Sequence, residues 1–318
     1  MKKLLIVLAL ACTLSSLYAQ KTCYSELKGD TLVIGNECIE RKFIWNDGNL
    51  VTYSLSDKAN RKTTFTVKQA PDFFISKDTR EASKGACRVE KVAATDIHPA
   101  YLKTIVTFSL GTLDIQRIYR IYDGCPAIAC DTYLKGSVNS VFGGREENAA
   151  DRKNIEFVED MKSKSVTAIL DQLYLKGQHW HAKAVEFWDV TDWNNNLLAE
   201  RDVIAYRKNS YRGNLLFVRN GEEGTGFFFL KESPCSSVQL AYKGADFGKF
   251  MITGLGITEK NIQEDTWTRT YSCVTGVYGD GELQALTALR SYQKNIRRHF
   301  RNRDEMVMMN TWGDRSQD

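Results

Sequence analysis

Apolar and polar residues alternate with a period of two through most of the chain between about residues 23 and 280. Because this period sends successive side chains to opposite faces of a strand, the pattern predicts β-structure. Two hairpins are expected, over residues 42–53 and 214–230, since in each case a glycine-containing turn separates two apolar runs. Further strands are expected over residues 104–110, 115–122 and 128–134. Many short strands at this spacing favour a large β-sandwich.

The period changes near residue 281. From Glu282 to Phe300 the apolar residues recur at intervals of three and four, which predicts a helix with one apolar face. This face would consist of Leu283, Leu286, Leu289, Tyr292, Ile296 and Phe300. Three arginines cluster near its C-terminal end: Arg297, Arg298 and Arg301. Positive charge complements the helix dipole there, so we interpret the cluster as a solvated helix end and not as a nucleic-acid site.

The segment after the helix has the pattern of a parallel strand that is buried on both faces. Residues 306–309 form a continuous apolar run, and polar and aromatic residues follow it. The sequence stops at Asp318, where such a strand would have no neighbouring element to cover it. We therefore expect residues 304–318 to be the first strand of a second domain, cut by truncation or by a split gene.

The N-terminus has the features of a secretory signal peptide. Lys2 and Lys3 precede the apolar run 4–11, and small and polar residues lead to an expected cleavage site after Ala19. The apolar run is too short to span a bilayer. The alternative is a lipoprotein signal with Cys12 as the acylated residue. Either signal predicts export to the periplasm or the cell exterior.

Composition and charge exclude several classes of protein. The 318 residues are 43% hydrophobic and 26% charged, which is typical of a folded globular protein. Removal of Lys2 and Lys3 with the leader leaves 41 basic against 39 acidic residues, a net charge of +2 instead of +4. This balance gives no reason to expect a nucleic-acid partner.

The cysteines do not form the pattern of a disulfide framework or of a zinc site. Seven remain after cleavage, an odd number scattered over 250 residues, with neither CxxC nor CxxH spacing. Most are expected to be buried thiols. The alternative that one or two disulfide bonds form is kept. Cys125 and Cys130 are five residues apart, so they should point to opposite faces of one strand.

Two further clusters could carry chemistry. Glu186, Asp189 and Asp192 lie among tryptophans, which is compatible with a carbohydrate site, although the following asparagines favour a strand end with turn aspartates. His179 and His181 would share one face of a strand, but a third metal ligand is not evident. We therefore expect no metal and no cofactor.

Several stretches resemble a known family: Asn214–Val218, Phe229–Ser236, Ala288–Arg297 and Arg303–Asp318. They are similar to secreted bacterial alpha-galactosidase-like proteins of glycoside hydrolase family 36, in the melibiase clan. The resemblance extends from about residue 30 to the end and is strongest after about residue 185. It implies an N-terminal β-supersandwich of two packed antiparallel sheets, a linker helix and a (β/α)8 barrel.

The resemblance also implies a reaction, the retaining hydrolysis of an alpha-galactoside. The two catalytic aspartates of the family lie on later barrel strands, so no catalytic residue is carried over to this chain. Trp312 matches the first-strand tryptophan that lines the sugar subsite. Asp314 follows it and would bond a sugar hydroxyl, although the family usually differs in detail at this point.

The expected organisation is therefore a signal peptide (1–19), an all-β supersandwich (20–280), a linker helix (281–303) and the start of a truncated barrel (304–318). The expected function is that of the non-catalytic N-terminal domain of an exported alpha-galactosidase-like hydrolase. Its glycan would bind through the missing barrel, and the chain would be inactive alone and would not span a membrane. The alternative is a stand-alone carbohydrate-binding β-sandwich protein.

Overall fold

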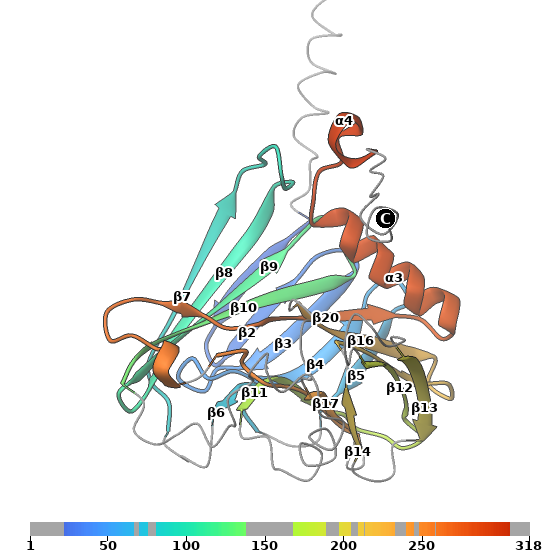
Figure 1. Ribbon diagram of the computed structural model, residues 1–318, viewed down its shortest axis with the longest axis horizontal. Coiled ribbons are helices and arrows are strands. Elements are labelled where there is room, and N and C mark those ends of the chain that lie inside the picture. Colours follow the sequence, from blue (N-terminus) through green and yellow to red (C-terminus); the bar gives the residue numbers. More distant parts are fainter. Residues whose placement is uncertain are drawn as a thin grey trace, which may run out of the picture.

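The computed structural model describes residues 22–66, 70–75, 81–137, 168–188, 197–204, 209–212, 214–232, 240–244, 248–257 and 259–305. Nearly all regular structure in these ranges is antiparallel β-sheet (Figure 1). Segments 1–21 and 306–318, which include the expected leader and the expected barrel strand, lie outside the described residues.

The first layer of the sandwich is one large sheet with the strand order β13-β12-β15-β16-β20-β10-β9-β8-β7, and β19 pairs with β10 beside β20. Its strands are β7 (Ser83–Val92), β8 (Tyr101–Leu110), β9 (Leu113–Ile121), β10 (Ala127–Gly136), β12 (His181–Trp188), β13 (Leu197–Ile204), β15 (Leu215–Asn220), β16 (Thr225–Glu232), β19 (Thr268–Arg269) and β20 (Ser272–Tyr278).

The second layer consists of two smaller sheets. One has β1 (Tyr24–Lys28), β2 (Thr31–Gly35), β3 (Ile39–Ile44), β4 (Val51–Asp57) and β5 (Lys62–Phe65) in sequential order. The other has the order β14-β17-β18-β11-β6, formed by β14 (Asn209–Arg212), β17 (Leu240–Gly244), β18 (Lys249–Thr253), β11 (Ala168–Tyr174) and β6 (Phe74–Ile75). A bridge between Thr66 and Leu175 joins the two sheets.

The strand predictions are confirmed. The hairpin β3–β4 pairs Phe43 with Thr52, and the hairpin β15–β16 pairs Phe217 with Phe228. Strand β9 alternates perfectly between buried and partly exposed positions, because one face meets the core and the other lies outside. The expectation of an all-β sandwich is therefore correct for the described residues.

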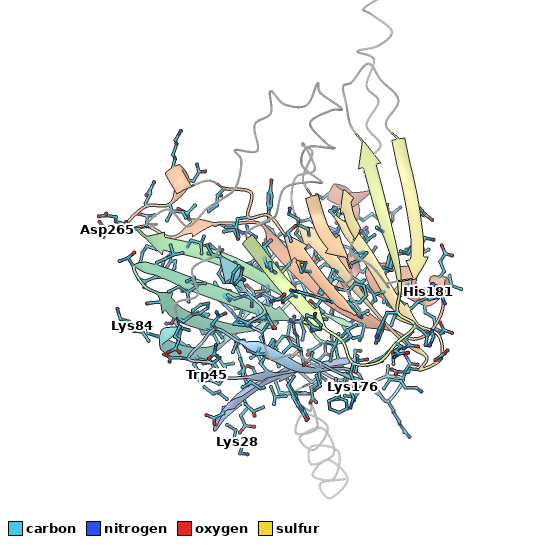
Figure 2. The ribbon with its side chains drawn as sticks, turned by 90° about the horizontal axis from the view of Figure 1, so that it is seen from below. Lys28, Trp45, Lys84, Lys176, His181 and Asp265 are labelled. Carbon is cyan, nitrogen blue, oxygen red and sulfur yellow. The ribbon has the colours of Figure 1, made fainter. Side chains whose placement is uncertain are left out.

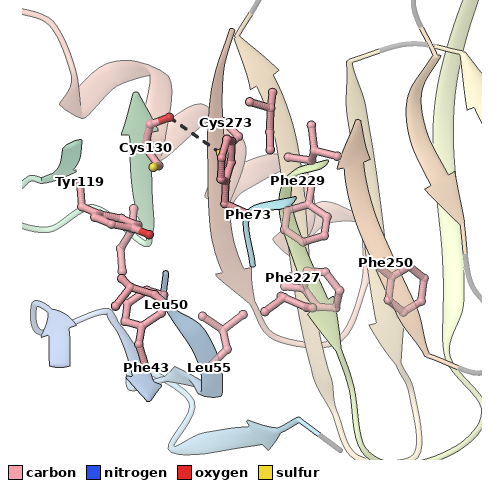
Figure 3. Packing of buried hydrophobic residues seen from close by; sticks show 14 of the residues in the cluster. Phe43, Leu50, Leu55, Phe73, Tyr119, Cys130, Phe227, Phe229, Phe250 and Cys273 are labelled. Carbon is pink, nitrogen blue, oxygen red and sulfur yellow. Dashed lines mark hydrogen bonds between the residues drawn. The ribbon is translucent and has the colours of Figure 1, made fainter. Parts of the chain in front are cut away.

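The main core lies between the two layers and contains aromatic residues from many strands (Figure 3). Phe227 packs edge-on against Phe229 and Phe250, with ring centroids 5.3 and 5.7 Å apart. A second, smaller cluster lies on the opposite face of the large sheet. Strand β20 belongs to both clusters and is buried at every position, because it is covered on both faces.

A network of charged residues lies inside the sandwich. Arg41 on β3 donates to both carboxylate oxygens of Asp171 at 2.7 and 2.8 Å, and to Asp72 at 2.9 Å. Arg117 on β9 lies 3.8 Å from Asp171 and donates to the carbonyl of Leu170. Burial raises the pKa of Asp72 to about 6, whereas for Asp171 the attraction and hydrogen bonds of Arg41 outweigh burial and lower the pKa.

Helix α3 (Glu282–Asn295) covers the second cluster and is shorter than predicted. The chain turns at Ile296, and a separate helical turn, α4 (Arg301–Asp304), follows; a 3₁₀ turn, η2, spans Glu259–Asn261. The predicted apolar face is wrong in part. Ala285, Ala288 and Tyr292 are the buried residues of α3, while Leu283 and Leu286 are 76% and 44% exposed.

Candidate functional site

The sequence-predicted site residues are largely beyond the described part of the chain. Trp312 and Asp314 lie in segment 306–318, and Asp189 and Asp192 lie in segment 189–196, both outside the described residues. Glu186 is placed only through its backbone, opposite Ala199 in the β12–β13 pair. The sugar-site roles given to these residues stay predictions.

The two histidines do not share a strand face, contrary to the sequence prediction. His179 has a positive φ of 63° and precedes the strand, which begins at His181. Trp180 between them is buried and donates to the carbonyl of Lys176 at 3.3 Å. Within the described ranges, no group of three or more histidine, cysteine, aspartate or glutamate side chains is arranged to hold a metal ion.

A cavity of about 360 Å³ opens where the first turn of α3 meets the outer face of the large sheet. It lies over strands β12 and β15, near the sheet edge opposite β7. Figure 2 labels His181, on β12 next to the edge strand β13, and Lys84, on the opposite edge strand β7. Its walls are mainly apolar and include two aromatic rings. The apolar lining residues are Val185, Leu215, Phe217, Tyr278, Ala285 and Leu286.

Charged side chains surround this cavity. Lys183 Nζ lies 2.8 Å from Glu200 Oε2 and 2.6 Å from Glu282 Oε1, so it connects β13 to the start of α3. Its hydrogen bonds to Glu200 and Glu282 raise the pKa of Lys183, and the same contact lowers the pKa of Glu282. Arg219 lies 3.8 Å from Asp280 on the same rim, which His181 also lines. An apolar cavity with a charged rim can hold a small amphipathic molecule or receive side chains of a docked protein.

Alanines and a tyrosine position α3 beside this cavity. The short side chains of Ala285 and Ala288 let the helix lie close to the sheet, over Phe217 and Phe228. Tyr292 is 1% exposed and its hydroxyl donates to Glu232 Oε1 at 2.6 Å. The sequence prediction assigned the buried face of α3 to the leucines because they are the most hydrophobic residues. Where a helix lies close to a sheet, small residues such as alanine fit the contact better than leucines.

Replacing Tyr292 by phenylalanine tests this docking contact. The change leaves Glu232 without a donor from the helix, so we expect the free energy of unfolding to fall by about 1.5 to 3 kcal/mol, as for hydrogen bonds to charged groups. Urea denaturation measures it. Leu283→Ala is the matched control on the same helix, and we expect a change within about 0.5 kcal/mol because Leu283 is exposed. Equal losses in both variants would contradict the observed orientation of α3.

The chain beyond α3 is held against the loop between β7 and β8. The backbone N–H of Arg298 donates to the carbonyl of Ile97 at 2.8 Å, and its guanidinium donates to the carbonyl of Thr95 at 3.0 Å. Arg303 donates to the carbonyl of Asp96 at 3.5 Å. Arg297, Arg298 and Arg301 are exposed, as expected, but they lie beyond the end of α3 at Asn295 and are not part of that helix.

The cavity and its rim were not among the sites predicted from the sequence. The available signal was the alternation His181, Lys183, Val185, which places polar and apolar groups together on one face of a strand. In the described ranges, no helix is both long enough and apolar enough to cross a membrane.

Comparison with known proteins identifies the fold. No protein-family model matches the chain, and no curated protein matches it. Its structure is similar to that of the GH36 alpha-galactosidase AgaB from Geobacillus stearothermophilus, with a TM-score of 0.53 and 8% identity, over 91% of this chain and 46% of that one.

Two other solved structures are similar to a smaller degree. An alpha-galactosidase from Lactobacillus brevis has a TM-score of 0.47 and 10% identity, over 86% of this chain and 42% of that chain. A variant of the alpha-galactosidase AgaA from Geobacillus stearothermophilus, in complex with raffinose, has a TM-score of 0.45 and 10% identity, over 88% and 44%. This chain thus spans less than half the length of each of these enzymes.

Proposed function

We propose that this chain is the N-terminal, non-catalytic sandwich domain of an exported, retaining alpha-galactosidase-like glycoside hydrolase. One observation carries the proposal: 91% of the chain shares the fold of AgaB while covering 46% of that enzyme. The chain would support a (β/α)8 barrel and its substrate cleft, and an alpha-galactoside would bind through that barrel.

The surface around α3 suits the supporting role. Leu283 and Leu286 are exposed apolar side chains beside the cavity, and a docked domain would remove them from water. The hydrogen bonds of Arg298 and Arg303 to residues 95–97 hold the polypeptide at a defined place where it leaves the sandwich. This contact would set the starting position of the barrel.

The chemistry would belong to the barrel. Retaining hydrolysis uses two carboxylates about 5–5.5 Å apart, one as the nucleophile and one as the general acid and base. We assign neither to this chain. Trp312 would present its ring to the C–H face of the sugar, and Asp314 would accept a hydrogen bond from a hydroxyl group.

The purified chain should therefore not hydrolyse a nitrophenyl alpha-galactoside. We expect no release of nitrophenol above that of buffer, and no saturable heat of binding with galactose or raffinose in calorimetry. Turnover that disappears in Glu186→Gln or Asp189→Asn would refute the assignment, because it would place the catalytic carboxylates in this chain. The DNA downstream of codon 318 provides a separate check, since it should encode a barrel.

The second candidate function is a stand-alone carbohydrate-binding protein. The observation that favours it is the cavity, in which Phe217 and Tyr278 lie beside the charged groups of Lys183 and Glu200. Saturable galactoside binding that is lost in Phe217→Ala, with no turnover, would support this function over the first.

A further inference from the structure

Two cysteines that are far apart in the sequence lie directly opposite each other in the large sheet. Cys130 on β10 pairs with Cys273 on β20, 143 residues later. The two side chains are 2% and 1% exposed and belong to the same interior cluster (Figure 3). Both are free thiols in the structure, and Cys273 Sγ lies 3.8 Å from the carbonyl oxygen of Cys130.

This placement meets the geometric requirement for a disulfide bond. Opposed residues on antiparallel strands have Cα atoms about 4.5 to 5.5 Å apart, within the range of about 4.4 to 6.8 Å that disulfides span. Both side chains point to the same face, since they share one core cluster. Cys125, by contrast, belongs to the cluster on the opposite face, as predicted, although it precedes β10 and does not share a strand with Cys130. Among the described cysteines, no other two are cross-strand partners in register.

The pair lies at the seam between the two halves of the large sheet. Residues 83–136 form β7 to β10, and residues 181–278 form the strands from β13 to β20. The halves meet along β10, which pairs with β20 at four positions, Ala127–Cys130 with Cys273–Gly276, and with β19 at two further positions, Tyr133 and Leu134. The neighbouring pairs β9–β10 and β16–β20 have nine and seven paired positions. Cys130 and Cys273 form the last of the β10–β20 pairs, next to the point where β19 begins to pair with β10.

We propose that Cys130 and Cys273 form a disulfide bond that joins the two halves of the sheet in the exported protein. The proposal rests on export, which is part of the proposed function, because disulfides persist in oxidising compartments. The two sulfurs are inaccessible in the folded sandwich, so the bond forms before the layers close.

The oxidant is a disulfide, either glutathione disulfide or the disulfide of an oxidoreductase. The Cys130 thiolate attacks one sulfur of the oxidant, which gives a mixed disulfide and releases the first thiol. The Cys273 thiolate then attacks the Cys130 sulfur and releases the second thiol. The two protein thiols lose two electrons and two protons, and the oxidant gains them, so that its disulfide becomes two thiols.

In the folded, reduced protein the two thiols of the pair have different surroundings. Burial opposes ionisation of Cys130, but its hydrogen bond with Cys273 and the nearby Arg117 guanidinium together lower its pKa. The hydrogen bond to Cys130 and burial raise the pKa of Cys273, so one thiol of the pair ionises first. Arg117 Nε and Nη1 have no hydrogen-bond acceptor among the described residues.

Peptide mapping of the whole chain tests the proposal. The chain is refolded from denaturant with a mixture of reduced and oxidised glutathione, alkylated and digested with trypsin. We expect a linked species of peptides 121–135 and 270–290. Because peptide 121–135 also contains Cys125, the link should persist in Cys125→Ala and disappear in Cys130→Ala. Recovery of both cysteines as alkylated thiols, or a link from Cys273 to any other cysteine, would overturn the proposal.

The unfolding temperature gives an independent readout. We expect the oxidised chain to unfold about 5–10 °C above the chain refolded with reductant, and this difference to vanish in Cys130→Ala. An equal difference in Cys130→Ala would also overturn the proposal. Export is tested separately, by N-terminal sequencing of protein recovered from the periplasm, which should begin at Gln20. The refolding result does not depend on export, so the two proposals fail independently.

Discussion

The chain with Arg41 replaced by methionine is expected to lose about 3 to 5 kcal/mol of folding free energy. This is the usual effect of removing one partner from a buried ion pair, because the remaining charge stays buried without compensation. Arg41 is 1% exposed and supplies donors to Thr52, Asp72 and Asp171. Methionine fills similar space but donates no hydrogen bond. The carboxylates of Asp72 and Asp171 would therefore stay in the core without the donor that Arg41 supplies.

Denaturation with guanidinium chloride measures this loss, and the next residue provides the control. Lys42 has a partly exposed side chain and pairs with Glu40 at 3.3 Å on the outer face of β3. Lys42→Met should change stability by less than about 1 kcal/mol. In the Arg41→Met background, Asp72→Asn should recover part of the loss, because one uncompensated charge is removed. A loss below about 1 kcal/mol for Arg41→Met would show that the network does not hold the layers together.

The second large effect is expected at Gly276, in the middle of β20. Phe228 on β16 is its cross-strand partner, and the ring lies over the glycine: an added Cβ would be 2.2 Å from two ring carbons. The same arrangement is repeated between Gly226 and Tyr278. Alanine at position 276 must displace a fully buried ring that packs against Phe217, so we expect a loss of about 3 kcal/mol.

The matched control for Gly276→Ala is Gly221→Ala in the turn between β15 and β16. A Cβ there would meet only the end of the Arg219 side chain, at 3.7 Å. We expect Gly221→Ala to change the unfolding temperature very little, or to raise it slightly, because alanine restricts the unfolded chain more than glycine does. Similar losses in both variants would mean that the Phe228 ring does not pack on Gly276.

The strands could be predicted from the sequence, but the buried ion network could not. Strand β9 shows why. Its alternation Ile115, Arg117, Tyr119, Ile121 predicts a strand correctly, since a period of two needs only local information. The same alternation places Arg117 on the buried face, where a charge requires partners. Those partners, on β11, come from another part of the sequence, so the pattern could not reveal the ion network. An arginine in phase with buried positions was nevertheless a usable signal.

The helix and the site show a second limit. The periodicity located α3 correctly, but Ala285 and Ala288 contact the sheet where leucines were expected to do so. The cavity depends on strands from 181–219 and on the helix that begins at Glu282, and their proximity follows from sheet order. Sheet order is set by contacts over long sequence distances, which a single sequence does not display. Trp312 and Asp314 remain predictions because they lie outside the described residues.

The position of β20 has a consequence for the biosynthesis of the protein. Among the described strands of the large sheet, β20 is the last in the sequence, yet it lies between β10 and β16. While the ribosome synthesises the chain, each of these strands therefore has an edge that is not paired with β20 until residue 278 has emerged. Unpaired strand edges can form hydrogen bonds with other chains and so cause aggregation. We infer that the nascent domain is most vulnerable to aggregation until then, and that a shielding factor would have to act before β20 is inserted.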